Sequence, residues 1–244
     1  MNVLVLSDIH GNLNALEAVL EKANGLGDID GLIILGDIID YGMGSNEVIK
    51  KLQSIQLPII CNIWGNHEYA ICNQDFTRFS SNRGVDSAQN TLKNLNVCSK
   101  QYLANEMLRE GFYEFVIGDK HCLGVHGSFH EPFWKSISTE QIDEKLEYAK
   151  YDYVFSGHSH IPLYFDAYYH TNNEKTRNKK KTIFLNPGSV GQPRNLNPLA
   201  QFLIVNCSTE EIRFYTVPYD IEKEQKLFTN EVSTFYKERL TWGV

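Results

Sequence analysis

The chain has 244 residues, of which 42% are hydrophobic and 22% charged, and its formal net charge is −7 at pH 7. This length is enough to bury a core without disulfides or a structural metal, so we expect a single domain that spans 1–244. The acidic balance disfavours a general nucleic-acid binder, and no apolar run approaches the ~18 residues that cross a membrane.

The first part of the chain alternates strands with helices. Short apolar runs predict strands, whereas apolar residues that recur on one helical face predict helices. In chain order these patterns give strand Val3–Leu6, helix Asn12–Ala23, strand Leu32–Leu35, helix Ser45–Ser54 and strand Ile59–Ile63. We expect Ser45 to cap its helix. A polar loop is expected after the third strand.

The remainder of the chain is predicted to be richer in strands. Gly118-Asp119 between two apolar runs predicts a hairpin. The predicted helices are Val85–Leu95, Ser99–Leu108, Thr139–Lys150 and Ile221–Arg239, and the predicted strands are Phe112–Ile117, Lys120–Val125, Tyr153–Phe155, Leu163–Tyr169, Thr182–Leu185, Phe202–Asn206 and Ile212–Val217. This order indicates a mixed α/β domain of two packed sheets with helices outside.

The cysteines and one basic segment bear on location and partners. The five cysteines are widely spaced without a CxxC pair, which favours free thiols and a cytoplasmic protein. The polar stretch 170–181 ends in three consecutive lysines. We expect it to be a solvated hairpin tip, with a docking patch for an anionic partner as the alternative.

Polar residues with metal-binding side chains follow five of the apolar runs. These segments are Ser7-Asp8-Ile9-His10, Gly36-Asp37-Ile38-Ile39-Asp40, Gly65-Asn66-His67-Glu68, His126-Gly127 and Gly157-His158-Ser159-His160. In an open α/β sheet, ligands bind beyond the carboxyl ends of the strands. One such segment alone is typical of a cap or a turn, but turn chemistry does not account for five in one chain. We therefore expect these segments to meet in one site.

The chemistry of this set points to metal catalysis. It offers imidazoles, carboxylates and an amide but no thiolate, which favours Mn²⁺, Fe or Zn²⁺ in a catalytic setting. Seven candidate ligands are too many for one tetrahedral ion and suit two ions ~3.5–4 Å apart with a bridging carboxylate. Such a pair generates hydroxide at neutral pH and holds phosphoryl oxygens. Gly36, Gly65 and Gly157 are expected to let the backbone turn sharply towards the ions.

With these motifs the chain resembles the calcineurin-like metallophosphoesterases. Their signature runs D-x-H, G-D-x-x-D, G-N-H-E, H-G and G-H-x-H, and here it extends from Asp8 to His160. The segment from Asn186 to Arg194, NPGSVGQPR, extends the resemblance to a bacterial and archaeal branch of small predicted phosphoesterases. The resemblance implies a four-layer αββα sandwich, in which two mixed β-sheets are flanked by helices.

The resemblance also implies a role for each site residue. Asp8, His10 and His160 would hold the first metal, Asp37 would bridge, and Asn66, His126 and His158 would complete the second. His67 would protonate the leaving oxygen or stabilise the transition state, with Asp40 orienting its ring. Asn66 would also contact the phosphate.

The chain departs from its relatives at two motifs. Many small members have Cys in place of His67 and Gly in place of Asp40. The Asp-Arg-Gly of phosphoprotein phosphatases is Asp40-Tyr41-Gly42 here, so the arginine that grips phosphate is missing. We take Arg194 as the candidate replacement for substrate binding, ahead of Arg83. His130 is a further candidate for lining the site, and Asn186 either contacts a ligand or closes its turn.

These observations predict an enzyme with two divalent metal ions, Mn²⁺ ahead of Fe or Zn²⁺. It would hydrolyse phosphate mono- or diesters of a small phosphorylated substrate by attack of a metal-activated hydroxide, with His67 as general acid. One alternative is a catalytically weak scaffold with the same fold that binds partner proteins. Others within the class are a protein phosphatase and a dinucleoside polyphosphate hydrolase. A nuclease is disfavoured by the acidic balance.

Overall fold

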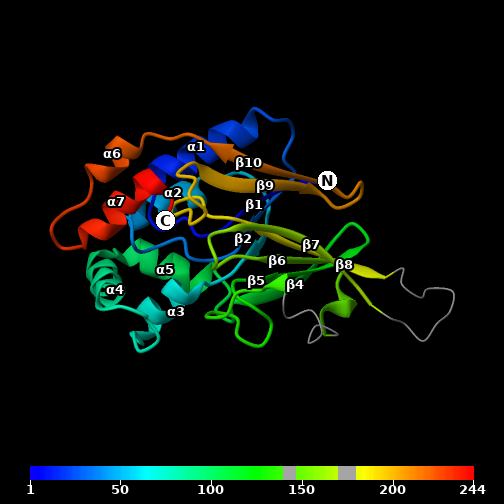
Figure 1. Cartoon of the computed structure of the whole chain (residues 1–244), viewed down its shortest axis with the longest axis horizontal. Coiled ribbons are helices and arrows are strands. Elements are labelled where there is room, and N and C mark those ends of the chain that lie inside the picture. Colours follow the sequence, from blue (N-terminus) through cyan, green and yellow to red (C-terminus); the bar gives the residue numbers. More distant parts are fainter. Residues whose placement is uncertain (140–146, 170–179) are drawn as a thin grey trace.

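The computed structural model describes residues 1–139, 147–169 and 180–244, and it contains two mixed five-stranded sheets flanked by helices (Figure 1). The first sheet consists of β1 (Asn2–Leu6), β2 (Gly31–Ile34), β3 (Ile59–Asn62), β9 (Ala200–Asn206) and β10 (Glu211–Val217), in the order β10-β9-β1-β2-β3. Because β1, β2 and β3 are parallel, their carboxyl ends meet at one edge.

The second sheet also combines parallel and antiparallel strands. It consists of β4 (Phe112–Ile117), β5 (Lys120–Val125), β6 (Tyr153–Ser156), β7 (Pro162–Tyr168) and β8 (Lys181–Pro187), in the order β4-β5-β6-β8-β7. The central strands β5, β6 and β8 are parallel, and the edge strands β4 and β7 are antiparallel to their neighbours. The predicted hairpin of β4 and β5 is confirmed.

The helices follow in chain order. They are α1 (Leu13–Asn24), α2 (Ser45–Gln53), α3 (Asn66–Asn73), α4 (Asn82–Asn94), α5 (Val97–Asn105), α6 (Ile221–Gln225) and α7 (Thr234–Trp242). Figure 1 shows α1 and α2 beside the first sheet, with α3 to α5 grouped at one end of the molecule. None of the helices within the described ranges is long and apolar enough to cross a membrane.

Alternation along β1 explains how the sheets pack. Successive side chains of a strand point to opposite faces, so Val3 and Val5 enter the core between the two sheets. Leu4 and Leu6 enter the core between the first sheet and the helices. Both faces of this strand are therefore buried, as its unbroken apolar run predicts.

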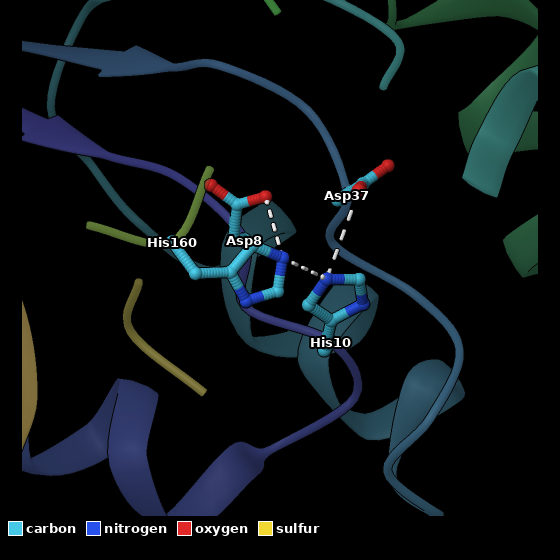
Figure 2. A group of neighbouring side chains, drawn as sticks. All are labelled: Asp8, His10, Asp37 and His160. Atoms are coloured by element: carbon cyan, nitrogen blue, oxygen red, sulfur yellow. Dashed lines mark hydrogen bonds and ion pairs between the residues drawn. The ribbon is translucent and has the colours of Figure 1, made fainter. Parts of the chain in front are cut away.

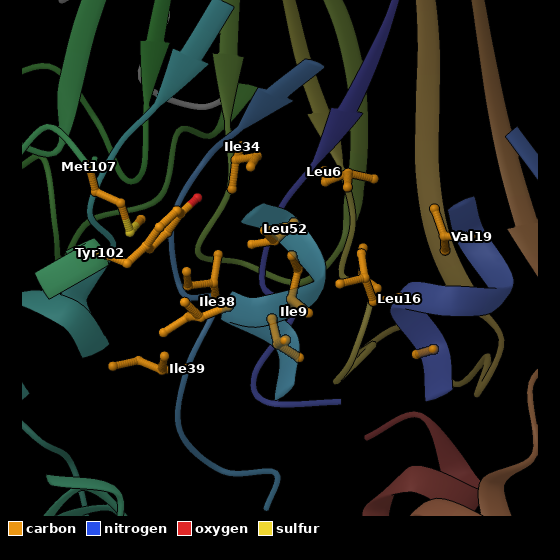
Figure 3. Close-up of a cluster of buried hydrophobic side chains, with 14 of the residues drawn as sticks. Leu6, Ile9, Leu16, Val19, Ile34, Ile38, Ile39, Leu52, Tyr102 and Met107 are labelled. Atoms are coloured by element: carbon orange, nitrogen blue, oxygen red, sulfur yellow. The ribbon is translucent and has the colours of Figure 1, made fainter. Parts of the chain in front are cut away.

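The core beneath the helices also anchors a loop of the site. Ile38 and Ile39 lie between the candidate residues Asp37 and Asp40, and both are fully buried. Figure 3 shows them among the side chains of the first sheet and of α1 and α2. Because protein interiors are close-packed, this contact fixes the loop that carries both carboxylates.

Two sequence expectations near the site were wrong. The segment expected to be a polar loop begins with the helix α3, which has only eight residues and too few turns to show a helical apolar pattern. The cap of α2 is Gly44 rather than Ser45. The hydroxyl of Ser45 instead accepts a hydrogen bond from the backbone N–H of Asp40 at 3.1 Å.

The predicted C-terminal helix Ile221–Arg239 was also wrong, because the structure has two helices there. Asp220 caps α6 by accepting from the backbone N–H of Lys223, and Ser233 caps α7 by accepting from that of Phe235. Each cap is a local start signal that interrupts the apolar pattern. Because the two helices are separate, α7 does not have to continue along the axis of α6.

Two further expectations fall mainly outside the described residues. Only the ends of the predicted helix Thr139–Lys150 are described, and residues 147–150 form a 3₁₀ turn. Most of the segment 170–181, including the predicted hairpin tip, also lies outside them. On the described part of the outer face, Ile137, Tyr148 and Tyr151 cover the second sheet.

Candidate metal centre

The candidate ligands lie where the carboxyl ends of the two sheets meet. The loops after β1 and β2 are joined by hydrogen bonds from Asp8 N to Gly36 O at 3.1 Å and from His10 N to Asp37 O at 2.9 Å. In the second sheet, Gly157 N donates to His126 O at 2.9 Å. These backbone bonds hold the ligand-bearing turns in register.

Two groups of side chains are arranged to hold a metal ion. The first is Asp8, His10, Asp37 and His160, and the second is Asp37, His126 and His158. Within each group the ligand atoms lie within 4.8 Å of one another. Figure 2 shows the first group, with its side chains turned towards a common centre. Asp37 belongs to both groups, as expected of a bridging carboxylate.

The histidines are oriented by bonds to backbone carbonyls. The Nδ1 atom of His10 lies 3.1 Å from Ile39 O, and that of His160 lies 2.6 Å from Gln192 O. These carbonyls can only accept, so each ring carries its proton on Nδ1 and leaves a lone pair on Nε2. This is the tautomer in which a metal-ligating histidine is normally held.

The first group of ligands therefore places hydrogen-bond acceptor atoms next to one another. The Nε2 atoms of His10 and His160 lie 3.2 Å apart, and Asp8 Oδ1 lies 3.2 Å from His160 Nε2. Burial lowers the pKa of both imidazoles, so no shared proton offsets their repulsion. Among the described residues Asp8 Oδ1 finds no hydrogen-bond donor. A divalent cation matches this set of nitrogen and oxygen donors.

The second group is organised around the carboxylate of Asp37. Its Oδ2 lies 3.3 Å from His126 Nε2 and 3.6 Å from His10 Nε2. Burial alone would raise the pKa of Asp37, but His126 and His67 hold it well below its usual value. Conversely, burial opposes protonation of His126, yet Asp37 raises its pKa to about 9. The local field thus favours a positive charge.

Asn66 and His158 complete the second group. Asn66 Oδ1 lies 3.0 Å from His126 Nε2 and 2.9 Å from His158 Nδ1. Burial, together with His126, lowers the pKa of His158 to about 3, so this ring is neutral. The amide oxygen therefore adds a third kind of donor beside the imidazoles and carboxylates.

His67 and Asp40 form a separate pair beside the metal ligands. His67 Nδ1 lies 2.6 Å from Asp40 Oδ2, and its Nε2 lies 3.9 Å from Asp37 Oδ2. Burial would lower the pKa of His67, but Asp37 and the hydrogen bond to Asp40 raise it. The structure thus brings together the two residues predicted to act as a pair.

Two hydroxyl groups that sequence reasoning missed hold Asp40. Its Oδ1 accepts from Ser87 Oγ at 2.7 Å and from Thr91 Oγ1 at 2.8 Å. Both come from α4, where their four-residue spacing places them on one face. That spacing is a signal in the sequence, but nothing local indicates which carboxylate they meet.

Glu68 is another residue whose part was not foreseen. Its buried carboxylate accepts from the backbone N–H groups of Gly65 and Asp37, each at 2.7 Å, and from those of Ile38 and Ile39 at 2.9 and 3.2 Å. It therefore ties the loop after β2 to the start of α3. The fourth letter of the G-N-H-E motif was the available signal.

The sharp turns are made by the candidate residues themselves. Six of them adopt φ between 49° and 71°, namely Asp8, His10, Asp37, Asp40, His158 and His160. Left-handed non-glycine residues cluster at functional sites and cost roughly 1–3 kcal/mol each. Of the three glycines expected to turn the chain, only Gly36 has positive φ. Gly65 and Gly157 allow close approach instead, because an added Cβ would lie 2.1 Å from Asp37 Oδ1 and 2.0 Å from Ser7 Oγ respectively.

A cavity of about 290 Å³ opens over this centre. Arg194 lines it with Asn66 and His67, and the Nε atom of Arg194 is buried without a partner among the described residues. Arg83 is not part of the lining, and its guanidinium lies 4.0 Å from the ring centroid of Phe235. A separate cavity of about 530 Å³ contains none of the candidate ligands.

The structure also shows the contacts of two other candidates from the sequence, Asn186 and His130. Asn186 closes its turn, because its Nδ2 donates to Gly157 O at 2.7 Å and its Oδ1 accepts from Gly188 N at 2.9 Å. His130 does not line the cavity, and its exposed ring lies 2.7 Å from a carboxylate oxygen of Glu147.

Tyr41 occupies the position where phosphoprotein phosphatases have arginine. Its ring centroid lies 4.6 Å from that of His10, 4.4 Å from that of His67 and 4.4 Å from that of Tyr236. The contact with Tyr236 brings α7 against the back of the site.

Comparisons with known proteins agree with the fold and the motifs. The sequence model of the calcineurin-like phosphoesterase superfamily domain matches residues 1–210. An uncharacterized protein of Methanocaldococcus jannaschii is 29% identical over 252 residues, covering 99% of this chain and 98% of its own. A metallophosphoesterase from Sphaerobacter thermophilus has a TM-score of 0.76 at 29% identity, with all of both chains covered. A hypothetical protein from Pyrococcus horikoshii has the same fold, with a TM-score of 0.79 at 24% identity over 100% of this chain and 98% of its own.

Proposed function

The chain belongs to the calcineurin-like phosphoesterase superfamily, and from that premise we propose that it is a phosphoester hydrolase that uses two divalent metal ions. One observation carries the proposal. Buried acceptor atoms of Asp8, His10 and His160 face each other at 3.2 Å with no proton between them. A bound cation is the simplest way to stabilise this arrangement.

Each group of ligands would hold one ion. Asp8, His10, Asp37 and His160 would hold the first, and Asp37, Asn66, His126 and His158 the second. When bound, the pair would lower the pKa of a nucleophilic water and screen the charge of the phosphoryl group. The donor set suits Mn²⁺ first, with Fe or Zn²⁺ as alternatives.

His67 would supply the proton for the leaving oxygen. Its Nδ1 is held by Asp40, and Asp37 and Asp40 raise the pKa of the ring, which favours the protonated form that a general acid needs. This Nε2 lies on the side of Asp37, next to the metal groups. Asp40 would act as a positioning residue, because it fixes the ring and the tautomer.

Arg194 and Asn66 would bind the phosphoryl oxygens of a small phosphorylated substrate. Arg194 lines the cavity, and its buried Nε has no acceptor among the described residues. A buried N–H donor that lacks an acceptor is well suited to an anionic group. Since Tyr41 stands in the place of the phosphatase arginine, we assign that role to Arg194. Arg78 also lines the cavity, but it forms an ion pair of 3.1 Å with Glu131.

Hydrolysis of bis-p-nitrophenyl phosphate and p-nitrophenyl phosphate tests the proposal. The protein is stripped with EDTA, reloaded with Mn²⁺ and compared with His67→Ala. Turnover should appear only with metal and fall about 10²- to 10⁴-fold in the variant. The ratio of the two rates assigns a diesterase or a monoesterase. Mn²⁺ binding without turnover of either ester would contradict the proposal and favour the protein-binding scaffold.

A further inference from the structure

A row of aromatic rings leads away from His67. The ring centroid of Phe79 lies 5.1 Å from that of His67 at an angle of 75°, and that of Trp134 lies 6.0 Å from Phe79 at 82°. Both rings line the cavity over the candidate metal centre and are only partly buried. The cavity therefore has a polar floor and one aromatic wall.

Contacts with neighbouring residues hold the wall in place, and Arg78, which makes two of them, also lines the cavity. The Arg78 guanidinium lies 5.3 Å from the ring centroid of Trp134 and makes an ion pair of 3.1 Å with Glu131. Phe79 sits in a turn closed by the bond from its own N–H to Phe76 O at 3.2 Å. These contacts link the segment before α4 to the segment that carries Trp134. A ligand would thus meet rings that are already oriented.

The position of the aromatic wall indicates which part of a bound substrate it would contact. Asp37, Asn66 and His158 form the floor, where the phosphoryl group would lie. Given the proposed function, His67 lies beside the leaving oxygen. Atoms beyond that oxygen then extend over Phe79 and, further out, over Trp134. The volume of about 290 Å³ is at the low end for small-molecule pockets, which suits one phosphoryl group and one ring system.

We propose that the leaving group carries a planar aromatic ring that packs against Phe79 or Trp134. Because these two rings are nearly perpendicular, at 82°, such a ring stacks on one of them and meets the other edge-on. The inference rests on the proposed function, because His67 defines the leaving-group side. Aromatic pairs gain more than the area they bury, and an alkyl group would not gain this from ring faces. A ring attached directly to the ester oxygen reaches Phe79, whereas a nucleobase one sugar away reaches Trp134.

Binding of non-hydrolysable phosphonates to the Mn²⁺-loaded protein, measured by calorimetry, tests the inference. One pair is benzylphosphonate and cyclohexylmethylphosphonate, which are similar in size but differ in planarity. The second pair is the methylenephosphonate analogue of adenosine 5′-monophosphate and the matching ribose analogue without its base. Stacking should make the aromatic member of at least one pair bind about tenfold tighter.

Substitutions of Phe79 and Trp134 show which side chain is responsible for the tighter binding of the aromatic ligand. Phe79→Leu should abolish the preference for benzylphosphonate, and Trp134→Leu that for the adenosine analogue. Phe79→Tyr and Trp134→Phe keep a ring and should retain both. Matched controls are Phe214→Leu on β10 and Trp242→Leu, whose parent side chains are 39% and 66% exposed elsewhere. A preference in the benzylphosphonate pair alone would assign the ring as an aryl group on the ester oxygen. A preference in the adenosine pair alone would assign it as a nucleobase.

Two results would overturn the inference. One is equal binding of planar and non-planar members in the wild type, and the other is a preference that survives both leucine variants. Methylphosphonate separates this failure from failure of the proposed function, since it has a phosphoryl-like group and no ring. If methylphosphonate binds only with Mn²⁺ and the ligand pairs show no preference for the aromatic member, only the proposed role of the aromatic wall is rejected. If it does not bind, the proposed function fails as well.

Discussion

The Nε2 atoms of His10 and His160 face each other at 3.2 Å, although both rings already donate their Nδ1 proton to a backbone carbonyl. Residues 150 positions apart are thus held in a contact that is unfavourable without a cation. Such a contact persists only where the surrounding structure imposes it. It is the geometric sign of a binding site rather than of a satisfied core.

The shared carboxylate gives the first prediction. Asp37→Asn should lower bound Mn²⁺ from two ions to one or none, because the amide removes the charge common to both groups. Mn²⁺ should also stabilise the wild type by about 2.7 kcal/mol at 100 times its Kd. Elemental analysis and thermal unfolding measure both effects. The exposed Asp86→Asn serves as control, and unchanged metal content in Asp37→Asn would refute the assignment.

The hydroxyls on α4 give the second prediction. The double variant Ser87→Ala, Thr91→Val removes both donors to Asp40 Oδ1, so the carboxylate is less well held against His67. We expect kcat to fall about tenfold while KM stays constant, since only positioning is lost. Steady-state kinetics with Thr77→Val as an exposed control checks this. A change in KM alone would point to a binding role.

Close packing at Gly157 gives the third prediction. In Gly157→Ala the new Cβ would lie 2.0 Å from Ser7 Oγ and 3.1 Å from Asp8 Oδ2, so these side chains or the strand ends that carry them must shift. We expect about 1–3 kcal/mol of destabilisation and weaker metal binding. Gly25→Ala is the matched control, because its Cβ would be 3.5 Å from the closest atom. Equal behaviour of the two variants in urea unfolding would argue against the close approach.

The fourth prediction concerns Arg194, whose buried Nε has no partner among the described residues. Arg194→Ala should raise KM about 10- to 100-fold, the loss expected for a charged hydrogen bond to the phosphoryl group. The loss should be larger for a monoester dianion than for a diester. Arg83→Ala, whose side chain packs on Phe235, should leave KM unaltered. A larger rise in KM for Arg83→Ala than for Arg194→Ala would assign substrate binding to Arg83.

A buried carboxyl group that belongs to neither metal group gives the fifth prediction. Burial raises the pKa of Glu224 above its ordinary value of 4.5, so the folded chain binds this proton more tightly than the unfolded chain. Its contribution to stability is full below pH 4.5 and falls as pH rises towards the raised pKa. Glu224→Gln should therefore gain stability relative to the wild type between pH 4 and pH 7.5.

Urea unfolding at the two pH values measures this difference. The exposed Glu222→Gln on the same helix is the control and should behave alike at both. A Glu224→Gln variant that loses stability at pH 7.5 would show that the bond from Asn14 Nδ2 to the Glu224 carboxylate, 2.7 Å long, outweighs the cost of burial.

The sequence alone determined the family and the two-sheet fold, and it named the candidate ligands that the structure brings together. Apolar runs followed by Asp, His or Asn marked the strand ends, and parallel strands place those ends at one edge. Short-range signals such as Gly118-Asp119 also predicted their elements correctly. These features are encoded by neighbours in the chain, so the pattern suffices to read them.

Only the tertiary structure decided how the site is held. The bonds that set the tautomers of His10 and His160 join residues from separate segments, and so do the hydroxyl bonds to Asp40 and the stack of Tyr41 on Tyr236. Three of the four bonds to Glu68 likewise come from the loop after β2. Sequence patterns specify which face a residue presents, whereas distances between faces arise only when the sheets and helices pack.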